Sequence, residues 1–186
     1  MKNKIIAPLN AALLAFACAI FGAGSNAAEP DWTYPAIQGF GKVVSLPGAG
    51  IQPGKDTDFK ALFNVAGPAD ADKVNPHLDK VARAVNIFAS AGIPLSHLHF
   101  IAVLHGPSTA AALDNAHYHE KFGVDNPNIK LIDALESAGV KVVVCGQALA
   151  HNKFPQEWVN PKVEITLSAI SDIILLEAQG YVLVPL

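Results

Sequence analysis

The chain has 186 residues, 51% of them hydrophobic, and carries 13 basic and 16 acidic side chains for a formal net charge of −3. This length suits one globular domain with a sizeable apolar core. The acidic balance and the lack of any basic run argue against nucleic acid as a partner.

The N-terminus predicts a secretion signal. Lys2 and Lys4 precede an almost wholly apolar run over 5–21. Ser25-Asn26-Ala27 fits the small-x-small rule, so we expect a signal peptide over 1–27 and a periplasmic or secreted mature protein without a membrane anchor. Cleavage after Ala28 is a close alternative. The apolar run is also near the minimum length for a membrane span, so a retained anchor is the other interpretation.

The mature chain would keep a single cysteine, Cys145, because Cys18 lies in the predicted signal. A lone cysteine cannot form an internal disulfide, so the fold must rely on its core even in an oxidising compartment. Cys145 is then either a small buried apolar residue or a reactive thiol.

Residues 28–58 are rich in Gly, Pro and polar residues and predict an extended N-terminal arm, with one short strand at 42–46. A regular alternation starts at residue 59. The expected strands cover 59–65, 99–104, 140–144, 163–167 and 181–184, and the expected helices cover 76–91, 109–122, 128–138 and 169–179, with a short helix after Cys145. Apolar strands that alternate with helices predict an α/β domain over 59–186, with a mainly parallel sheet covered on both faces.

Two reactive residues follow directly after apolar strands. Cys145 ends the run VVVC, and His105 follows HFIAVL. Parallel sheets bind ligands beyond the carboxyl ends of their strands, so both side chains would meet at one edge if these strands are neighbours.

The position of Cys145 favours reactivity. The free N–H groups at a helix N-terminus stabilise a thiolate, and Gly146 would let the backbone turn tightly while leaving the sulfur uncrowded. His105 is a candidate base or imidazolium partner for the thiolate. The alternative is that Cys145 is a core residue and that His105 only ends its strand.

A Cys–His hydrolase would also need an orienting side chain. Asn86, Asn126 and Gln147 are available, but no spacing selects one of them. The hydrolase hypothesis is therefore weak.

The histidines do not predict a metal site. His97 and His99 point the same way if extended, but His105 lies roughly 20 Å further along the strand. His117 and His119 do not face each other on a helix. No HExxH or CxxC motif is present, so we expect neither a metal nor a cofactor.

The glycine-rich segment LPGAGIQPGK at 46–55 predicts a loop. Gly48 and Gly54 are one residue too far apart for a phosphate-binding P-loop, and Asp56 stands where that motif needs Ser or Thr.

The segment AISDIILLEAQ at 169–179 carries more apolar surface than one stripe against a sheet requires. This excess predicts a homo-oligomer. Deep burial within one subunit is the alternative.

Four segments resemble the DsrE/DsrF-like proteins of sulfur metabolism, more narrowly their exported single-domain members. The segments are VARAVNIFASAGIP, IAVLHGP, FGVDNPNIKLIDALESAGVKVVVCGQALA and VEITLSAISDIILLEAQGYVLVP. The resemblance covers about 59–186 and implies a three-layer α/β/α sandwich of flavodoxin-like appearance that assembles into trimers or hexamers.

In the sulfur-relay members of this family, a cysteine in the position of Cys145 accepts sulfane sulfur as a persulfide and passes it on. His105, Gly146 and Gln147 match the rest of the motif, and Asn126 is a further candidate for substrate binding. The resemblance therefore implies a sulfur carrier or sulfurtransferase, with persulfide proteins or small sulfane-sulfur compounds as donors and acceptors. A single cysteine also suits a carrier, since no second thiol can expel the persulfide as a disulfide.

One feature departs from the family pattern. The well-understood relay members are cytoplasmic, whereas this chain carries a predicted secretion signal. The alternative function is a non-catalytic oligomeric binding protein of the same fold with a structural cysteine.

Overall fold

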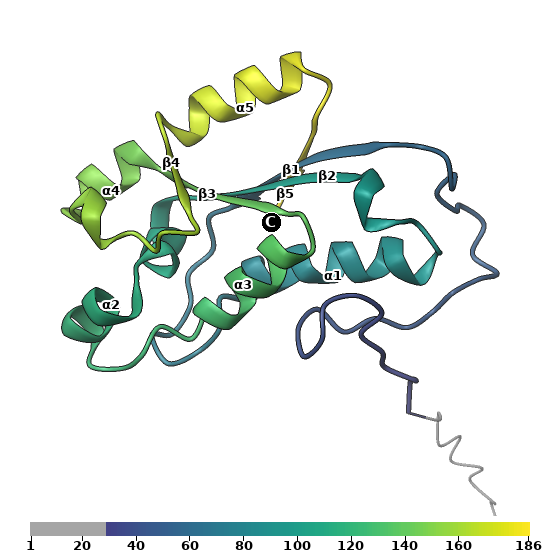
Figure 1. Cartoon of the computed structure of the whole chain (residues 1–186), viewed down its shortest axis with the longest axis horizontal. Helices are drawn as coiled ribbons and strands as arrows, with labels where there is room; N and C mark the ends of the chain where they lie inside the picture. Colours follow the sequence, from purple (N-terminus) through teal and green to yellow (C-terminus); the bar gives the residue numbers. More distant parts are fainter. Residues whose placement is uncertain (1–28) are drawn as a thin grey trace, which may run out of the picture.

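A computed structural model describes residues 29–186 and contains one five-stranded sheet (Figure 1). The strands are β1 (Phe59–Val65), β2 (Leu98–Leu104), β3 (Lys141–Cys145), β4 (Glu164–Thr166) and β5 (Val182–Pro185). They lie in the order β4-β3-β2-β1-β5, and every neighbouring pair is parallel. The prediction of a parallel sheet is confirmed. The predicted signal peptide lies outside the described residues.

Helices cover both faces of this sheet. The α-helices are α1 (Pro76–Ser90), α2 (Asn115–Phe122), α3 (Ile129–Ser137), α4 (Gly146–Asn152) and α5 (Ala169–Ala178). Short 3₁₀ helices are η1 (Leu95–His97), η2 (Gly106–Ala112) and η3 (Gln156–Trp158). Figure 1 shows α1 and α3 on one face and α5 on the other. The expected three-layer α/β/α sandwich is confirmed.

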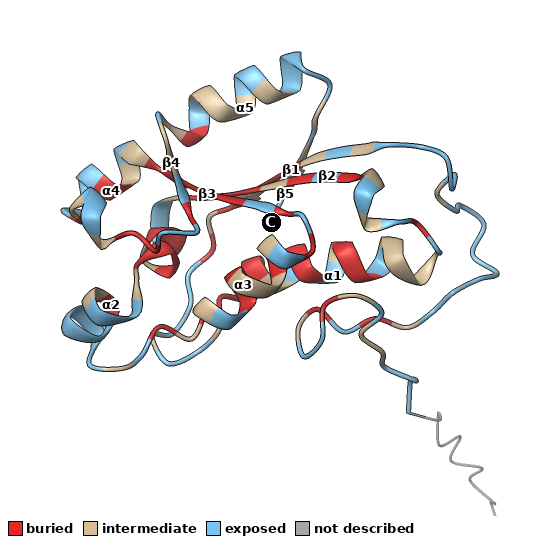
Figure 2. Ribbon diagram, viewed as in Figure 1, coloured by how far each residue is buried: buried red, intermediate tan, exposed pale blue. Residues whose placement is uncertain are grey.

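The helices cover the two faces of the sheet unequally. On one face, α5 is the crossover helix that leads from β4 at one edge to β5 at the other. Most of the buried core lies between the sheet and α1 with α3. The buried residues on the other face form a small α5-side cluster: Leu62, Val103, Val143, Cys145 and Ala169. In Figure 2, α5 is mostly intermediate or exposed, whereas α1 and α3 are buried where they meet the sheet.

Two predicted elements differ in the structure. The helix expected over 109–122 is broken: η2 ends at Ala112, Leu113 is extended, and α2 starts after Asp114. The Asp114 side chain accepts the His117 N–H and is the N-cap of α2. Aspartate is among the strongest N-cap residues, so it starts a new helix here. The strand expected over 42–46 is only a single antiparallel bridge between Thr33 and Val43.

Asn86 on α1 holds the N-terminal arm. It has no exposed surface, and its Oδ1 accepts the N–H groups of Ala36 and Ile37 at 2.9 and 2.8 Å. Its Nδ2 donates to the carbonyls of Ile37, Phe40 and Gly41. This asparagine, a candidate orienting residue for a hydrolase, therefore uses its amide to bind the arm.

We expect Asn86→Leu to lower the free energy of unfolding by about 2–4 kcal/mol, because each buried backbone group left unpaired costs about 1–3 kcal/mol. Urea unfolding monitored by circular dichroism measures the change. Gln38→Leu is the matched control, since it removes an exposed amide in the same arm and should cost under about 0.5 kcal/mol. Equal effects of the two substitutions would show that the arm contacts are unimportant for stability.

Candidate functional site at the carboxyl edge of the sheet

Cys145 ends β3 and starts α4. Its backbone is extended, with φ −66° and ψ 115°, and its Sγ accepts the N–H of Ala148 at 3.4 Å. The thiol is therefore the N-cap of α4, and a thiolate would be the stronger acceptor for this N–H. The predicted strand-to-helix junction at Cys145 is confirmed.

Cys145 is almost inaccessible to solvent. Cys145 is only 6% exposed and belongs to the α5-side cluster. The sequence left open whether Cys145 is buried, and the structure shows that it is, with Ala169 at the start of α5 in the same cluster. A reagent must therefore be small, or the start of α5 must move, to reach the sulfur.

Gly146 is required for a different reason from the one expected. A Cβ at this position would lie 2.7 Å from the backbone oxygen of Thr166, closer than real Cβ atoms approach. Thr166 pairs with Cys145 in the β3–β4 register. The glycine thus lets the end of β4 pack closely on the start of α4.

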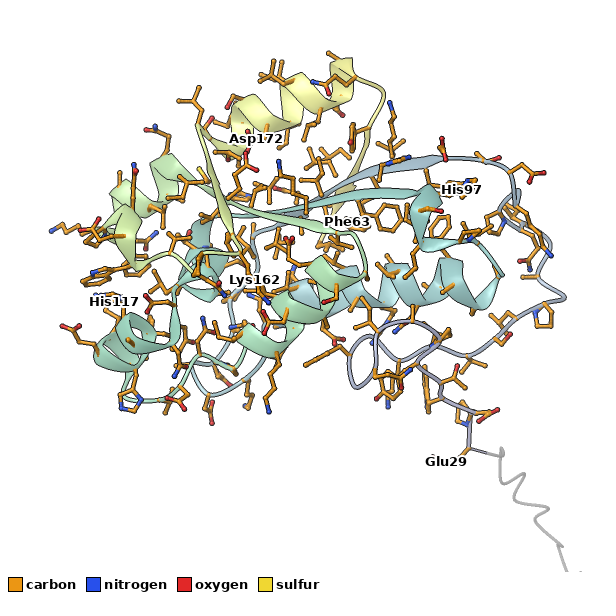
Figure 3. All side chains as sticks on the ribbon, in the orientation of Figure 1. Glu29, Phe63, His97, His117, Lys162 and Asp172 are labelled. Atoms are coloured by element: carbon orange, nitrogen blue, oxygen red, sulfur yellow. The ribbon has the colours of Figure 1, made fainter. Side chains whose placement is uncertain are left out.

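Gln147 is exposed and its amide donates to the carbonyl of Leu167 at 3.5 Å. Thr166 hydrogen-bonds Asp172 on the first turn of α5 (Asp172 is labelled in Figure 3). These contacts tie α4, β4 and α5 together beside Cys145. Thr166 and Asp172 were not expected from the sequence, because nothing local distinguishes them from other polar residues at element ends.

His105 lies beside Cys145 at the same edge. The backbone N–H of His105 donates to the backbone carbonyl oxygen of Val65 at 3.1 Å. This hydrogen bond extends the pairing of β1 and β2 by one residue. Leu104 pairs with Val144, so His105 and Cys145 are the next residues on adjacent strands, which run about 4.8 Å apart. The condition for the two strand ends to meet at one edge, that their strands are neighbours, is therefore fulfilled.

Asn64 on β1 binds the imidazole of His105. Nε2 of His105 and Oδ1 of Asn64 are 2.5 Å apart. Burial lowers the pKa of His105 below its ordinary value, so the imidazole is neutral at neutral pH. Sequence reasoning missed Asn64. The sequence feature that could have identified Asn64 is its position as a polar residue near the end of the mostly apolar strand FKALFNV.

The lowered pKa of His105 predicts a loss of stability on acidification. The unfolded chain binds a proton at His105 as pH falls below about 6.5, whereas the folded chain does not until the pH is lower. This contribution to stability is therefore complete above about pH 6.5 and is lost as pH falls through the folded pKa. Urea unfolding at several pH values should show a shallower pH dependence for His105→Gln. His119→Gln, at an exposed histidine, is the control, and an unchanged slope in His105→Gln would contradict the prediction.

Asn126 lies in a buried polar network and not on an open binding surface. Its Nδ2 donates to the carbonyls of Ala111 and Leu113 at 3.1 and 2.7 Å, and its Oδ1 accepts the Asn128 N–H. The network continues through Asn128, Asn75, Ser108 and Gly67. These contacts occupy the amide of Asn126 and fix the loops at the carboxyl edge.

His97 and His99 lie at the opposite end of the sheet from this site. His97 Nδ1 and His99 Nε2 are 3.1 and 3.8 Å from Asp58 Oδ1, near the amino ends of β1 and β2 (His97 is labelled in Figure 3). Asp58 is the nearest acidic partner of both.

On α2, His117 bonds Asp114 and stacks on Trp158 with ring centres 4.8 Å apart. His119 pairs instead with Asp125. Among residues 29–186, no three His, Cys, Asp or Glu side chains are arranged as a metal-ligand set. Within the same residues no helix is both long and apolar enough to cross a bilayer.

Comparisons with known proteins agree with this fold. The model of the DsrE/DsrF-like family matches residues 60–185. No curated protein matches the sequence. Among solved structures, the protein of unknown function MTH1491 from Methanobacterium thermoautotrophicum is similar, with a TM-score of 0.51 and 13% identity over 69% of this chain and 100% of that one. A likeness at this identity shows the fold alone, but the family match covers most of the described residues. The chain therefore belongs to the DsrE/DsrF-like family.

Proposed function

We propose that this protein is a sulfur carrier in which Cys145 accepts a sulfane sulfur as a persulfide and passes it to an acceptor. The observation that carries the proposal is the place of Cys145, whose Sγ ends a β-strand and accepts the Ala148 N–H in the first turn of α4. Family membership supports a role in sulfur relay. His105, on the adjacent strand end, supplies a nearby base.

The loading step exchanges one sulfur between two thiols. The Cys145 thiolate attacks the outer sulfur of a donor R–S–SH, forms Cys145–S–SH, and releases R–S⁻, which takes up a proton. No oxidant or reductant is needed, because the sulfane sulfur keeps its oxidation state. Transfer to an acceptor thiolate is the same exchange in reverse.

The apolar surroundings of Cys145 suit such an intermediate. Leu62, Val103 and Val143 pack with it in the α5-side cluster, and Cys145 itself is 6% exposed. A persulfide held there is shielded from water and from bulky thiols that would remove its outer sulfur. Small inorganic polysulfides fit this site best among possible donors, while a protein partner would have to displace the start of α5.

We also propose that the mature protein acts outside the cytoplasm, as a homo-oligomer. The apolar run after Lys4 and the small residues before Ala28 support export. Cell fractionation followed by N-terminal sequencing tests the export, since an uncleaved protein that stays in the cytoplasmic fraction would contradict it.

A second function is favoured by one observation, the burial of Cys145. Free cysteines are often small core residues. In that case the protein is a binding module of the same fold, and its thiol has no chemistry.

Intact-mass spectrometry separates the two functions. The reduced mature protein is incubated with inorganic polysulfide, then desalted and weighed, with and without dithiothreitol. A carrier gains one sulfur atom that the reductant removes. A protein that gains no sulfur, and whose thiol is alkylated only in urea, is the binding module.

A further inference from the structure

Asn64 and His105 form a polar pair on the α5 side of the sheet. Asn64 pairs with Val103 in the β1–β2 register, and Val103 belongs to the α5-side cluster. Strand residues alternate between the two faces, so Val103 and His105 point the same way. Cys145, two residues beyond Val143 on β3, lies in the same cluster.

The chemistry of the two groups sets the tautomer. The Oδ1 of Asn64 is an amide oxygen, which only accepts hydrogen bonds, and it lies 2.5 Å from Nε2 of His105. A neutral imidazole has one N–H, and the nitrogen that donates it leaves the other as an acceptor. With Nε2 donating to Asn64, Nδ1 is the basic nitrogen.

We propose that Asn64 is a positioning residue for sulfur loading: it holds His105 in the Nε2–H tautomer, so that Nδ1 accepts the proton of the Cys145 thiol. This proposal rests on the proposed sulfur-carrier function for its chemistry, but the tautomer itself does not. Burial keeps the imidazole neutral and thus able to take a proton.

The proton follows a balanced path. The S–H bond of Cys145 breaks, its electron pair stays on sulfur, and His105 Nδ1 gains the proton. The thiolate then takes the outer sulfur of R–S–SH, and the imidazolium returns its proton to the departing R–S⁻. His105 and Asn64 end the step as they began it.

The first test reads the tautomer directly, without any sulfur donor. Long-range ¹H–¹⁵N correlation of histidine-labelled mature protein distinguishes a protonated ring nitrogen from an unprotonated one, and His105→Ala identifies the signals of His105 among those of the other histidines. We expect the Nε2–H form in the wild type. The isosteric Asn64→Leu should show a mixture, and Asn64→Asp, which keeps an acceptor, should restore the single tautomer when it is measured at a pH at which the ring of that variant is neutral.

The second test reads the rate of persulfide formation. Asn64→Leu should slow loading by about 10- to 100-fold, the range found for side chains that orient metal-bound histidines. In the His105→Ala background the same substitution should have no further effect, because residues that act as a unit are not additive. If Asn64 only stabilised the fold, Asn64→Leu would instead slow loading equally in the wild type and in the His105→Ala variant.

The pH profile of loading gives a third reading. Asn64→Asp places a carboxylate against the ring, which stabilises the imidazolium and should move the acidic limb of the profile, where His105 becomes protonated and cannot act as a base, to higher pH. An Nδ1–H tautomer in the wild type, or equal slowing by Asn64→Leu with and without His105, would overturn the proposal. If the wild type takes up no sulfur at all, the carrier function fails, while the tautomer experiment still decides the role of Asn64.

Discussion

Cys145→Ser should abolish the gain of a sulfur atom from polysulfide and leave the fold intact. Serine cannot form a persulfide, so the loss is complete. Its hydroxyl can still accept the Ala148 N–H that Sγ accepts in the wild type, and serine is among the best N-cap residues. The cap therefore offsets the cost of placing a hydroxyl in the α5-side cluster. Intact mass after polysulfide treatment and the melting temperature measure the two effects.

Two further variants sharpen this result. Cys145→Ala also blocks loading but removes the cap, so it should be less stable than Cys145→Ser, by about 0.5–2 kcal/mol. His105→Ala should slow loading without preventing it, since the histidine only assists formation of the thiolate. If Cys145→Ser fails to fold, or if it still gains sulfur, Cys145 is not the carrier.

Replacing apolar residues on the outer face of α5 should convert the proposed homo-oligomer into a monomer. Ile170 and Ile174 lie one turn apart on the same face of the helix. Their side chains are 73% and 63% exposed, which is unusual for isoleucine. Leu167 and Leu175 extend this apolar surface. A charge placed in a buried subunit contact loses its hydration without gaining a partner, so Ile170→Glu with Ile174→Glu should prevent association.

Light scattering coupled to gel filtration at micromolar concentration measures the mass. We expect a multiple of the subunit mass for the wild type and the subunit mass for the double variant, with similar circular dichroism spectra. Ile51→Glu is the control, because Ile51 is 94% exposed in the arm and away from α5. A wild-type protein that is already a monomer would refute the oligomer and leave α5 as an exposed apolar helix.

The assembly also bears on the chemistry. Ala169 at the start of α5 packs in the same cluster as Cys145. Subunits that associate through α5 would hold this helix in place and further restrict access to the thiol. The monomeric variant should then load sulfur faster than the wild type if α5 controls entry.

The sequence by itself determined those helices and strands whose bounds depend on neighbouring residues in the chain. The apolar run of β1, the helical periodicity of α1 and the glycines that follow the helices predicted bounds that match the structure within a few residues. The junction at Cys145 was also local, since a run of valines followed by Gly146 ends a strand and starts a helix. One exception was 109–122, where apolar residues continued a helical pattern but the Asp114 cap divided it.

The tertiary structure decided which side chains meet and which are covered. Asn64 and His105 are 41 residues apart and bond only because β1 and β2 are neighbours in register. Asn86 binds an arm about 50 residues earlier in the chain. Cys145 is buried in a cluster with Ala169, the first residue of α5, which returns across the sheet from β4 to β5. Local periodicity encodes which residues are apolar and where an element ends, but strand order and the path of a crossover arise from contacts distant in sequence, which no local pattern contains.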